Sequence, residues 1–160
     1  MKLRAVLPLD REAEGHFTVT DDDGASLFGP IRCRGEADNT QAMAHQNPEE
    51  VPARSFGDHP YGMYKVGNIV QEPRPTRSYG PFFITLSPVS GEALVAWQNG
   101  RRGIGIHGGD LGAQGQLRAT YGCLRLENKA LEEVVALIRP EQETGRDVWY
   151  ECVALKPEGQ

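Results

Sequence analysis

The sequence contains no long apolar run and no cluster of basic residues. No window approaches the roughly 20 apolar residues of a membrane-spanning helix, so we predict no membrane span. The 160 residues carry a formal net charge of −5 without a run of Lys or Arg, which argues against a nucleic-acid groove. Sequence repeats and low-complexity segments are also absent, and we expect a single domain over residues 1–160.

Cysteine is scarce, with only Cys33, Cys123 and Cys152. Three cysteines cannot all pair within one chain, so at least one thiol must be free. Cys33 and Cys152 each lie in an apolar, strand-like run. We therefore expect both to be small core residues rather than a disulfide pair.

The sequence also lacks the spacings that are typical of metal sites. The acidic run 21–24 has neither the ligand spacing nor the distal Glu of an EF-hand, and it is predicted to form a solvated hairpin turn. His45 and His59 have no Cys, Asp or Glu partner at metal-ligand spacing, so we expect them at the surface. We predict no metal and no cofactor.

Glycine and proline are abundant instead, with 19 and 11 residues, and they favour many turns and short strands over a helical bundle. The chain is therefore predicted to be mainly β. Asn99-Gly100 is a hairpin signal. Residues 35–60 show little periodicity and are expected to form a long irregular loop, such as a lid or binding loop. Strands are predicted at 3–9, 16–20, 26–28, 61–70, 82–86, 93–97, 103–106 and 147–155.

One helix is clear from the sequence. It begins after Asn128, a good N-cap residue, and it should end at Pro140, which cannot continue the backbone hydrogen bonds. Its apolar positions fall on one face at helical spacing. These positions are Leu131, Val134, Val135 and Ile138.

A histidine and a cysteine with glycine neighbours are the strongest chemical signal. His107 precedes Gly108, and Cys123 follows Gly122. A thiol becomes a strong nucleophile when a nearby imidazole takes its proton, and glycine lets the backbone approach a substrate. We predict that His107 serves as the base, and that the amides of residues 122–124 stabilise an oxyanion. The alternative is a buried structural cysteine and a histidine that bonds only to backbone.

Arg125 follows two residues after the cysteine. Its guanidinium can bind a carboxylate through two parallel hydrogen bonds. The sequence therefore predicts that Arg125 binds a carboxylate of the substrate.

These residues match the motifs of a known family. His107-Gly108 is followed by Thr120-Tyr121-Gly122-Cys123-Leu124-Arg125, with Asn128 three positions further on. Upstream lies Pro60-x-Gly62-x-Tyr64-x-Val66. Over about residues 55–130 the chain resembles the L,D-transpeptidase catalytic domain, or YkuD-like, family.

The resemblance implies an L,D-transpeptidase-like β-sandwich with one clear helix and an enzyme that acts on peptidoglycan stem peptides. It implies that Cys123 attacks a stem-peptide carbonyl to form a thioester, with His107 as base and Gly122 beside the nucleophile. Transfer of the acyl group to an amine is transpeptidation, and transfer to water is carboxypeptidase or endopeptidase activity. The substrate-binding residues implied are Arg125, Tyr121, Thr120, Gly108 and Tyr64.

Three departures from the family pattern keep alternatives open, one of which is a slightly short connection from His107 to Cys123. Tyr121 stands where the family has a second histidine, so proton transfer would depend on His107 alone. No leader is visible, although the expected place of action is the periplasm or cell wall. A wall-targeting toxin of this fold, delivered by a secretion apparatus and neutralised by an immunity protein, is one alternative. A catalytically lapsed peptide-binding protein and an unrelated cysteine peptidase are the others.

Overall fold

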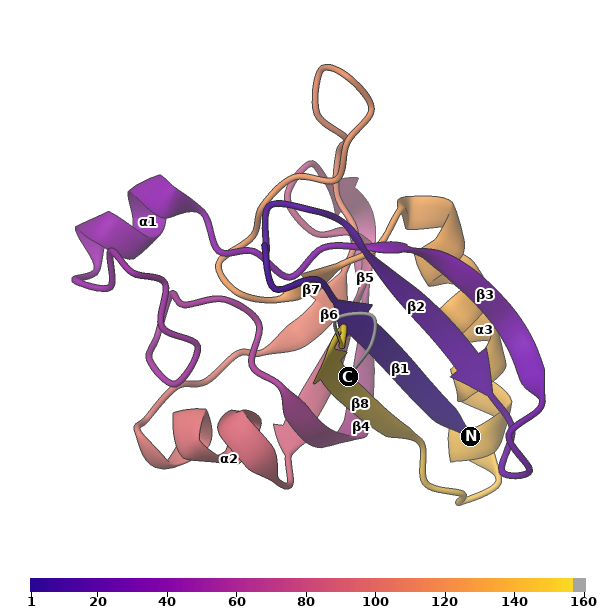
Figure 1. Cartoon of the computed structure of the whole chain (residues 1–160). Helices are drawn as coiled ribbons and strands as arrows, with labels where there is room; N and C mark the ends of the chain where they lie inside the picture. The colour runs from indigo at the N-terminus through magenta and orange to yellow at the C-terminus, as the bar shows by residue number, and fades with distance from the viewer. Residues whose placement is uncertain (157–160) are drawn as a thin grey trace.

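The computed structural model describes residues 1–156, and this part of the chain is mainly β, as predicted (Figure 1). Its strands are β1 (Lys2–Leu7), β2 (Gly15–Thr20), β3 (Ser26–Cys33), β4 (Gly62–Thr76), β5 (Gly80–Pro88), β6 (Gly105–His107), β7 (Leu124–Arg125) and β8 (Trp149–Ala154). They form one mixed sheet in the order β3-β2-β1-β8-β4-β5-β6-β7.

The last strand joins the two ends of the chain within this sheet. β8 pairs in parallel with β1, with Leu3 opposite Tyr150, and it pairs antiparallel with β4, with Gly62 opposite Cys152. The pairs β1–β2, β2–β3, β4–β5 and β5–β6 are antiparallel, whereas β6 and β7 are parallel. A parallel pair needs a crossover connection, and residues 108–123 supply it.

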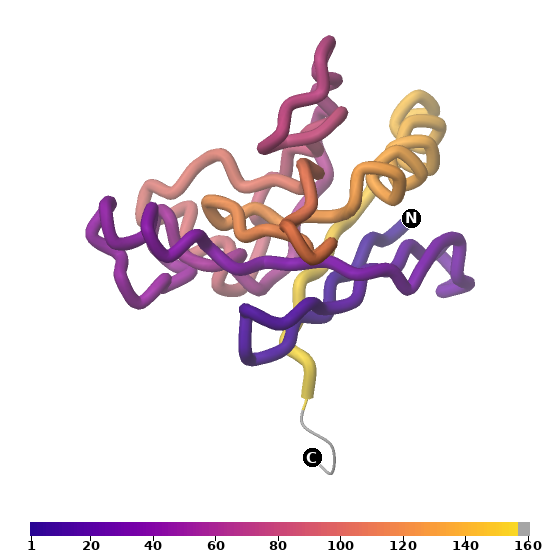
Figure 2. The backbone as a smooth tube through the Cα atoms, turned by 90° about the horizontal axis from the view of Figure 1, so that it is seen from above, coloured from indigo at the N-terminus to yellow at the C-terminus, as the bar shows by residue number. Residues whose placement is uncertain are grey.

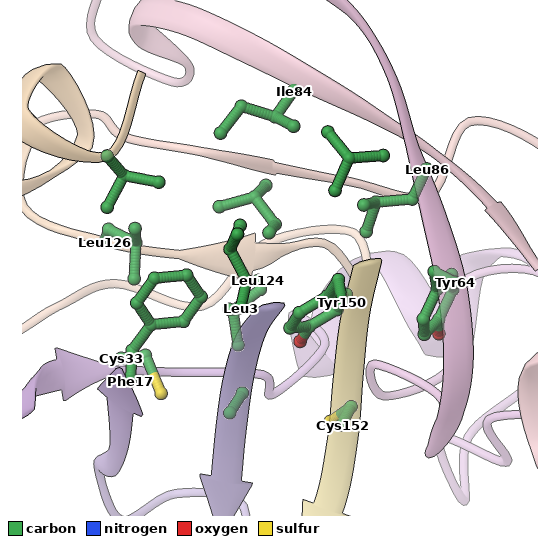
Figure 3. Close-up of a cluster of buried hydrophobic side chains, with 14 of the residues drawn as sticks. Leu3, Phe17, Cys33, Tyr64, Ile84, Leu86, Leu124, Leu126, Tyr150 and Cys152 are labelled. Atoms are coloured by element: carbon green, nitrogen blue, oxygen red, sulfur yellow. The ribbon is translucent and has the colours of Figure 1, made fainter. Parts of the chain in front are cut away.

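One hydrophobic cluster draws on all eight described strands and on the longest helix. Side chains alternate between the two faces of a strand, so β1 buries every second residue, Leu3, Ala5 and Leu7. Figure 3 shows Leu3 on one side of this cluster and Ile84 of β5 on the other. The bent sheet therefore encloses its own core, and both ends of the sheet are held in one packed unit.

Three helices are present among the described residues: α1 (Asn39–Ala44), α2 (Gly91–Gln98) and α3 (Asn128–Glu143). The prediction of a strand at 93–97 is wrong, because this segment lies in α2. Ala93 and Ala96 are buried three residues apart, while Val95 and Trp97 are exposed, which is helical spacing. Asn99 consequently caps the C-terminus of α2 and does not begin a hairpin.

The predicted helix is confirmed as α3, but both of its predicted ends are wrong. Pro140 lies inside the helix, which continues to Glu143. Its missing N–H forfeits one bond to the carbonyl of Ala136, and both residues are exposed. Asn128 does not cap the helix, because its Oδ1 accepts a hydrogen bond from the amide of Gly109 at 2.8 Å.

Residues 35–60 are more ordered than the sequence suggests. They contain α1 and a series of turns that are closed by backbone hydrogen bonds, such as that from Asp58 N to Glu50 O at 3.0 Å. The α1 segment and α3 lie at opposite ends of the molecule (Figure 2). The acidic turn is confirmed as a hairpin, with Asp21 Oδ1 accepting from the amides of Asp23 and Ala25.

Replacing Pro140 with alanine should stabilise the protein. The change restores one helical hydrogen bond at an exposed position, and we expect a gain of about 1–3 kcal/mol in the free energy of unfolding, measured by urea denaturation. Leu131→Ala, on the buried face of the same helix, should cost about 2–5 kcal/mol. An unchanged or lower stability of Pro140→Ala would mean that α3 ends before this residue.

Candidate active site

The parallel pairing of β6 and β7 brings His107 and Cys123 together. The register places His107 opposite Arg125, and Cys123 lies two residues before Arg125. Because side chains alternate along a strand, His107 and Cys123 project from the same face of the sheet. His107 and Cys123 are 16 positions apart in sequence, but this pairing makes them diagonal neighbours on adjacent segments.

Both side chains line one cavity of about 460 Å³. This volume is in the range of ordinary ligand sites. Its walls are largely apolar and aromatic, with Glu72 and two arginines as the charged residues. The lining residues are Ser55, Phe56, Val70, Glu72, Tyr79, Phe83, Arg101, Arg102, Gly103, Ile104, His107, Tyr121, Gly122 and Cys123.

His107 is held as a neutral imidazole with a free Nε2. Its Nδ1 lies 2.8 Å from the carbonyl oxygen of Gly108, and a carbonyl can only accept, so Nδ1 carries the proton. Burial is the main cause that lowers the pKa of His107 to about 4, and the charge of Arg125 adds to it. At neutral pH the ring can therefore accept a proton at Nε2.

Cys123 rests as a neutral thiol. It is 8% exposed, and its Sγ lies 3.4 Å from the carbonyl oxygen of Gly103. Burial raises the pKa of the thiol to about 11, against the opposing effects of the Gly105 amide and the charges of Arg101 and Arg125. The site therefore does not hold a thiolate–imidazolium pair at rest.

The turn that precedes Cys123 is fixed by Thr120. Its Oγ1 accepts from the amide of Gly122 at 2.9 Å and donates to the carbonyl of Cys123 at 2.8 Å. The Gly122 amide therefore already donates a hydrogen bond to Thr120. Leu124 belongs to strand β7, which pairs with β6. Of the amides predicted to stabilise an oxyanion, that of Cys123 is the one with no acceptor among the described residues.

Gly122 is required by its surroundings. Its φ is +108°, a conformation that side chains rarely adopt. A Cβ at this position would also lie 1.9 Å from Arg101 Nη2 and 2.3 Å from the carbonyl oxygen of Gly57. Only glycine therefore lets the turn before Cys123 lie this close to Arg101 and Gly57.

Arg125 does not present its guanidinium to the main cavity. It is 3% exposed and donates to the carbonyls of Arg118, Ser78, Gly108 and Ala119. These bonds tie together the loops on both sides of His107. Most of its donors therefore hold backbone carbonyls, but Arg125 also lines the smaller cavity of about 170 Å³, and the carboxylate contact stays a prediction.

The other predicted substrate contacts divide into two groups. Tyr121 is 55% exposed and lines both the main cavity and a smaller one of about 170 Å³, which Thr120 also lines. Tyr64 is fully buried, and its hydroxyl donates to the carbonyl of Pro60 at 2.6 Å. Gly108 is buried and holds His107 by its carbonyl. Tyr64 and Gly108 therefore lie in the protein interior and support the residues that line the cavity.

The sequence prediction missed two buried residues beside the turn that leads to Cys123. His59, expected at the surface, is fully buried because its ring packs between the sheet and the nucleophile turn. Arg101 is 3% exposed and donates to the carbonyls of Pro52, Gly57 and Asp58. For His59, the sequence offered one indication of a place near the site: it directly precedes the Pro60-x-Gly62-x-Tyr64 element.

Within residues 1–156 no group of three or more His, Cys, Asp or Glu side chains is arranged to hold a metal ion. Cys33 and Cys152 are free and buried in the core, where the sequence placed them. None of the helices in the described part of the chain has the length and apolar character needed to span a membrane.

A family model described as the L,D-transpeptidase catalytic domain (YkuD) matches residues 46–148, which include His107 and Cys123. The chain belongs to this family.

Two solved structures are similar to the chain. They are Bd1075 of Bdellovibrio bacteriovorus, at 15% identity and a TM-score of 0.46, and the Ldtfm-avibactam carbamoyl enzyme, at 13% identity and a TM-score of 0.45. The alignments cover 83% and 98% of this chain but only 42% and 49% of those chains. No curated protein matches the chain.

Iodoacetamide should label Cys123 before Cys33 and Cys152. Cys123 borders a cavity, whereas the other two lie in the core, where burial raises the pKa of Cys152 to about 12 and that of Cys33 still further. Peptide mapping by mass spectrometry would follow each thiol. The labelling rate of Cys123 should keep rising up to about pH 11. A plateau near pH 7 would contradict the neutral resting thiol.

Arg101→Gln should slow the labelling of Cys123. The positive charge of Arg101 lowers the pKa of the thiol, so its removal raises that pKa and reduces the thiolate present at a given pH. A rise of one unit corresponds to about tenfold slower alkylation at pH 9. Arg102→Gln is the matched control, because Arg102 lines the same cavity but stacks on Trp97. Equal rates in both variants would remove Arg101 from this role.

Proposed function

We propose that the protein catalyses cysteine-dependent acyl transfer on peptidoglycan stem peptides through a thioester. Membership of the L,D-transpeptidase family supports the substrate class. The observation that carries the mechanism is the arrangement of Cys123 and His107, which line one cavity from the same face of β6–β7. The free Nε2 of His107 supplies a base there.

In the first half of the reaction, Sγ of Cys123 turns away from the Gly103 carbonyl and attacks the acyl carbon. Its proton passes to Nε2 of His107 as the S–C bond forms, so no free thiolate is needed. The developing oxyanion accepts a hydrogen bond from the amide of Cys123. The C–N bond then breaks, and the leaving amine takes the proton from Nε2.

In the second half, an amine or a water molecule attacks the thioester. Nε2 of His107 removes the proton of the attacking group, and the intermediate collapses to release Cys123, which takes the proton back. An amine acceptor gives an exchanged or cross-linked stem peptide, and water gives a shortened one. Both outcomes use the same residues.

Tyr121 fits a substrate-packing role in this scheme. Its ring lies 5.9 Å from that of Phe56 at the cavity wall, and it is more than half exposed. His107 is the one histidine that lines the main cavity in the described structure, so all proton transfer is assigned to it. On this proposal the protein works in the periplasm or cell wall. A secretion apparatus and an immunity protein are the partners to look for.

Purified peptidoglycan fragments incubated with the protein should yield shortened or exchanged stem peptides, detected by mass spectrometry. Cys123→Ala should abolish both products, and His107→Gln should slow them by about 10²–10⁴-fold because the base is lost. Cys33→Ala is the control for loss of a thiol outside the cavity and should retain activity. Fragments that remain intact with the native protein would overturn the proposed substrate.

A further inference from the structure

The carbonyl of Gly122 is held from inside the protein by His59. The Nδ1 of His59 lies 3.0 Å from this oxygen, and Nε2 lies 2.9 Å from the hydroxyl of Tyr150 on β8. Since a carbonyl only accepts, Nδ1 carries the proton, and Nε2 must accept from Tyr150. A hydrogen-bonded chain thus runs from the central strand through the ring to the residue before the nucleophile.

His59 is rigidly placed. Its amide donates to the carbonyl of Gly35 at 2.8 Å, and its own carbonyl accepts from Arg11 Nη1 at 2.9 Å. Its ring stacks at 10° to that of Tyr64, with 5.7 Å between centroids. The ring is fully buried, and burial is the main cause that lowers its pKa to about 3. His59 therefore stays neutral and keeps one orientation at ordinary pH.

This bond determines where the amide of Cys123 points. In a trans peptide the carbonyl of one residue and the N–H of the next point in opposite directions. With the Gly122 oxygen held toward His59, the Cys123 N–H faces away from the interior wall formed by His59. Thr120 fixes the peptide units on both sides, so the Gly122–Cys123 peptide is the one that depends on His59.

The glycine itself makes such a restraint necessary. Gly122 has no side chain to limit its backbone, and rotation about its ψ and the φ of Cys123 would turn the Gly122–Cys123 peptide over. That rotation would point the Cys123 N–H away from the substrate and direct a carbonyl oxygen toward the developing negative charge. The bond to His59 opposes this rotation.

We propose that His59 is a positioning residue, which orients the Gly122–Cys123 peptide so that the Cys123 amide stabilises the oxyanion formed at Cys123. Tyr150 orients the ring of His59 for this task. The inference rests on the proposed acyl transfer at Cys123 but not on the identity of the acyl donor.

Two substitutions of similar size separate the two hydrogen bonds of His59. Asparagine can place its Nδ2 where Nδ1 of the histidine lies, so His59→Asn keeps the donor to Gly122 and loses the contact with Tyr150. Glutamine reaches the position of Nε2, so His59→Gln keeps the contact with Tyr150 and loses the donor to Gly122. Each variant leaves one buried polar group without its partner.

Two reactions of Cys123 provide the readout. p-Nitrophenyl acetate acylates the thiol through an oxyanion: the S–C bond forms, p-nitrophenolate leaves, and the thiol proton is taken up by His107. Iodoacetamide alkylates the same sulfur by displacement of iodide, and no oxyanion develops. The ratio of the two rates isolates oxyanion stabilisation from thiol access and pKa, and Cys123→Ala supplies the background for both reagents.

We expect His59→Gln to lower the acylation-to-alkylation ratio by about 10–100-fold. A Cys123 amide that no longer points at the oxyanion stabilises it little. His59→Asn should stay within about threefold of the native ratio, because its amide always keeps a donor for Gly122. Tyr150→Phe should lie between them, because an imidazole without the Tyr150 hydroxyl can move its proton from Nδ1 to Nε2 and lose the donor to Gly122. Equal ratios in the two His59 variants would overturn the proposal. If neither variant folds, a native ratio in Tyr150→Phe overturns it, and a reduced one supports it.

The same measurements separate this inference from the proposed function. If stem peptides are left intact but the ratio falls in His59→Gln, the positioning role stands and the substrate is wrong. If stem peptides are processed and the ratio does not respond to the loss of the Gly122 contact, the proposed function stands and the role of His59 is wrong.

Discussion

The short parallel pairing of β6 with β7 is the contact on which the proposed active site depends. It closes the connection 108–123 and sets His107 and Cys123 on one face of the sheet. Arg125 reinforces it from the opposite strand, because it donates to the carbonyl of Gly108 at the start of the connection and to that of Ala119 further along it. Asn128 adds a bond to Gly109 from the start of α3. The residues after Cys123 thus hold His107 in place.

Burial decides the ionisation states in this site. His107 and His59 are both kept neutral, and the Cys123 thiol is kept protonated, because each charged form would lose its hydration. Arg101 and Arg125 oppose this effect at the thiol. The site therefore suits a reaction in which charge develops only during attack, rather than one that starts from a preformed ion pair.

The segment 35–60 does more than its composition suggests. It was predicted to be a long irregular loop, such as a lid or binding loop, and Ser55 and Phe56 do line the main cavity. Its end, Gly57 to His59, also forms the wall behind Gly122. Arg101 secures that wall through the carbonyls of Pro52, Gly57 and Asp58. Local composition cannot reveal this, because the bonds join residues that lie more than 40 positions apart.

Local patterns predicted much of the secondary structure. Alternation indicated most of the strands, and helical spacing indicated α3, since each depends on near neighbours in sequence. The prediction of a strand at 93–97 was wrong because a short apolar run is compatible with both a strand and a helix. The predicted ends of this helix were wrong for two reasons. The exposed last turn tolerates Pro140, and the Oδ1 of Asn128 accepts a hydrogen bond from the amide of Gly109 instead of capping the helix.

The sequence by itself singled out His107 and Cys123 as the proposed reactive pair, because their glycine neighbours and spacing are local features. Only the tertiary structure decided which groups support them. It assigned Arg125 to backbone carbonyls and buried His59 behind Gly122. These roles follow from hydrogen bonds and burial between distant segments, and such contacts have no pattern along the chain.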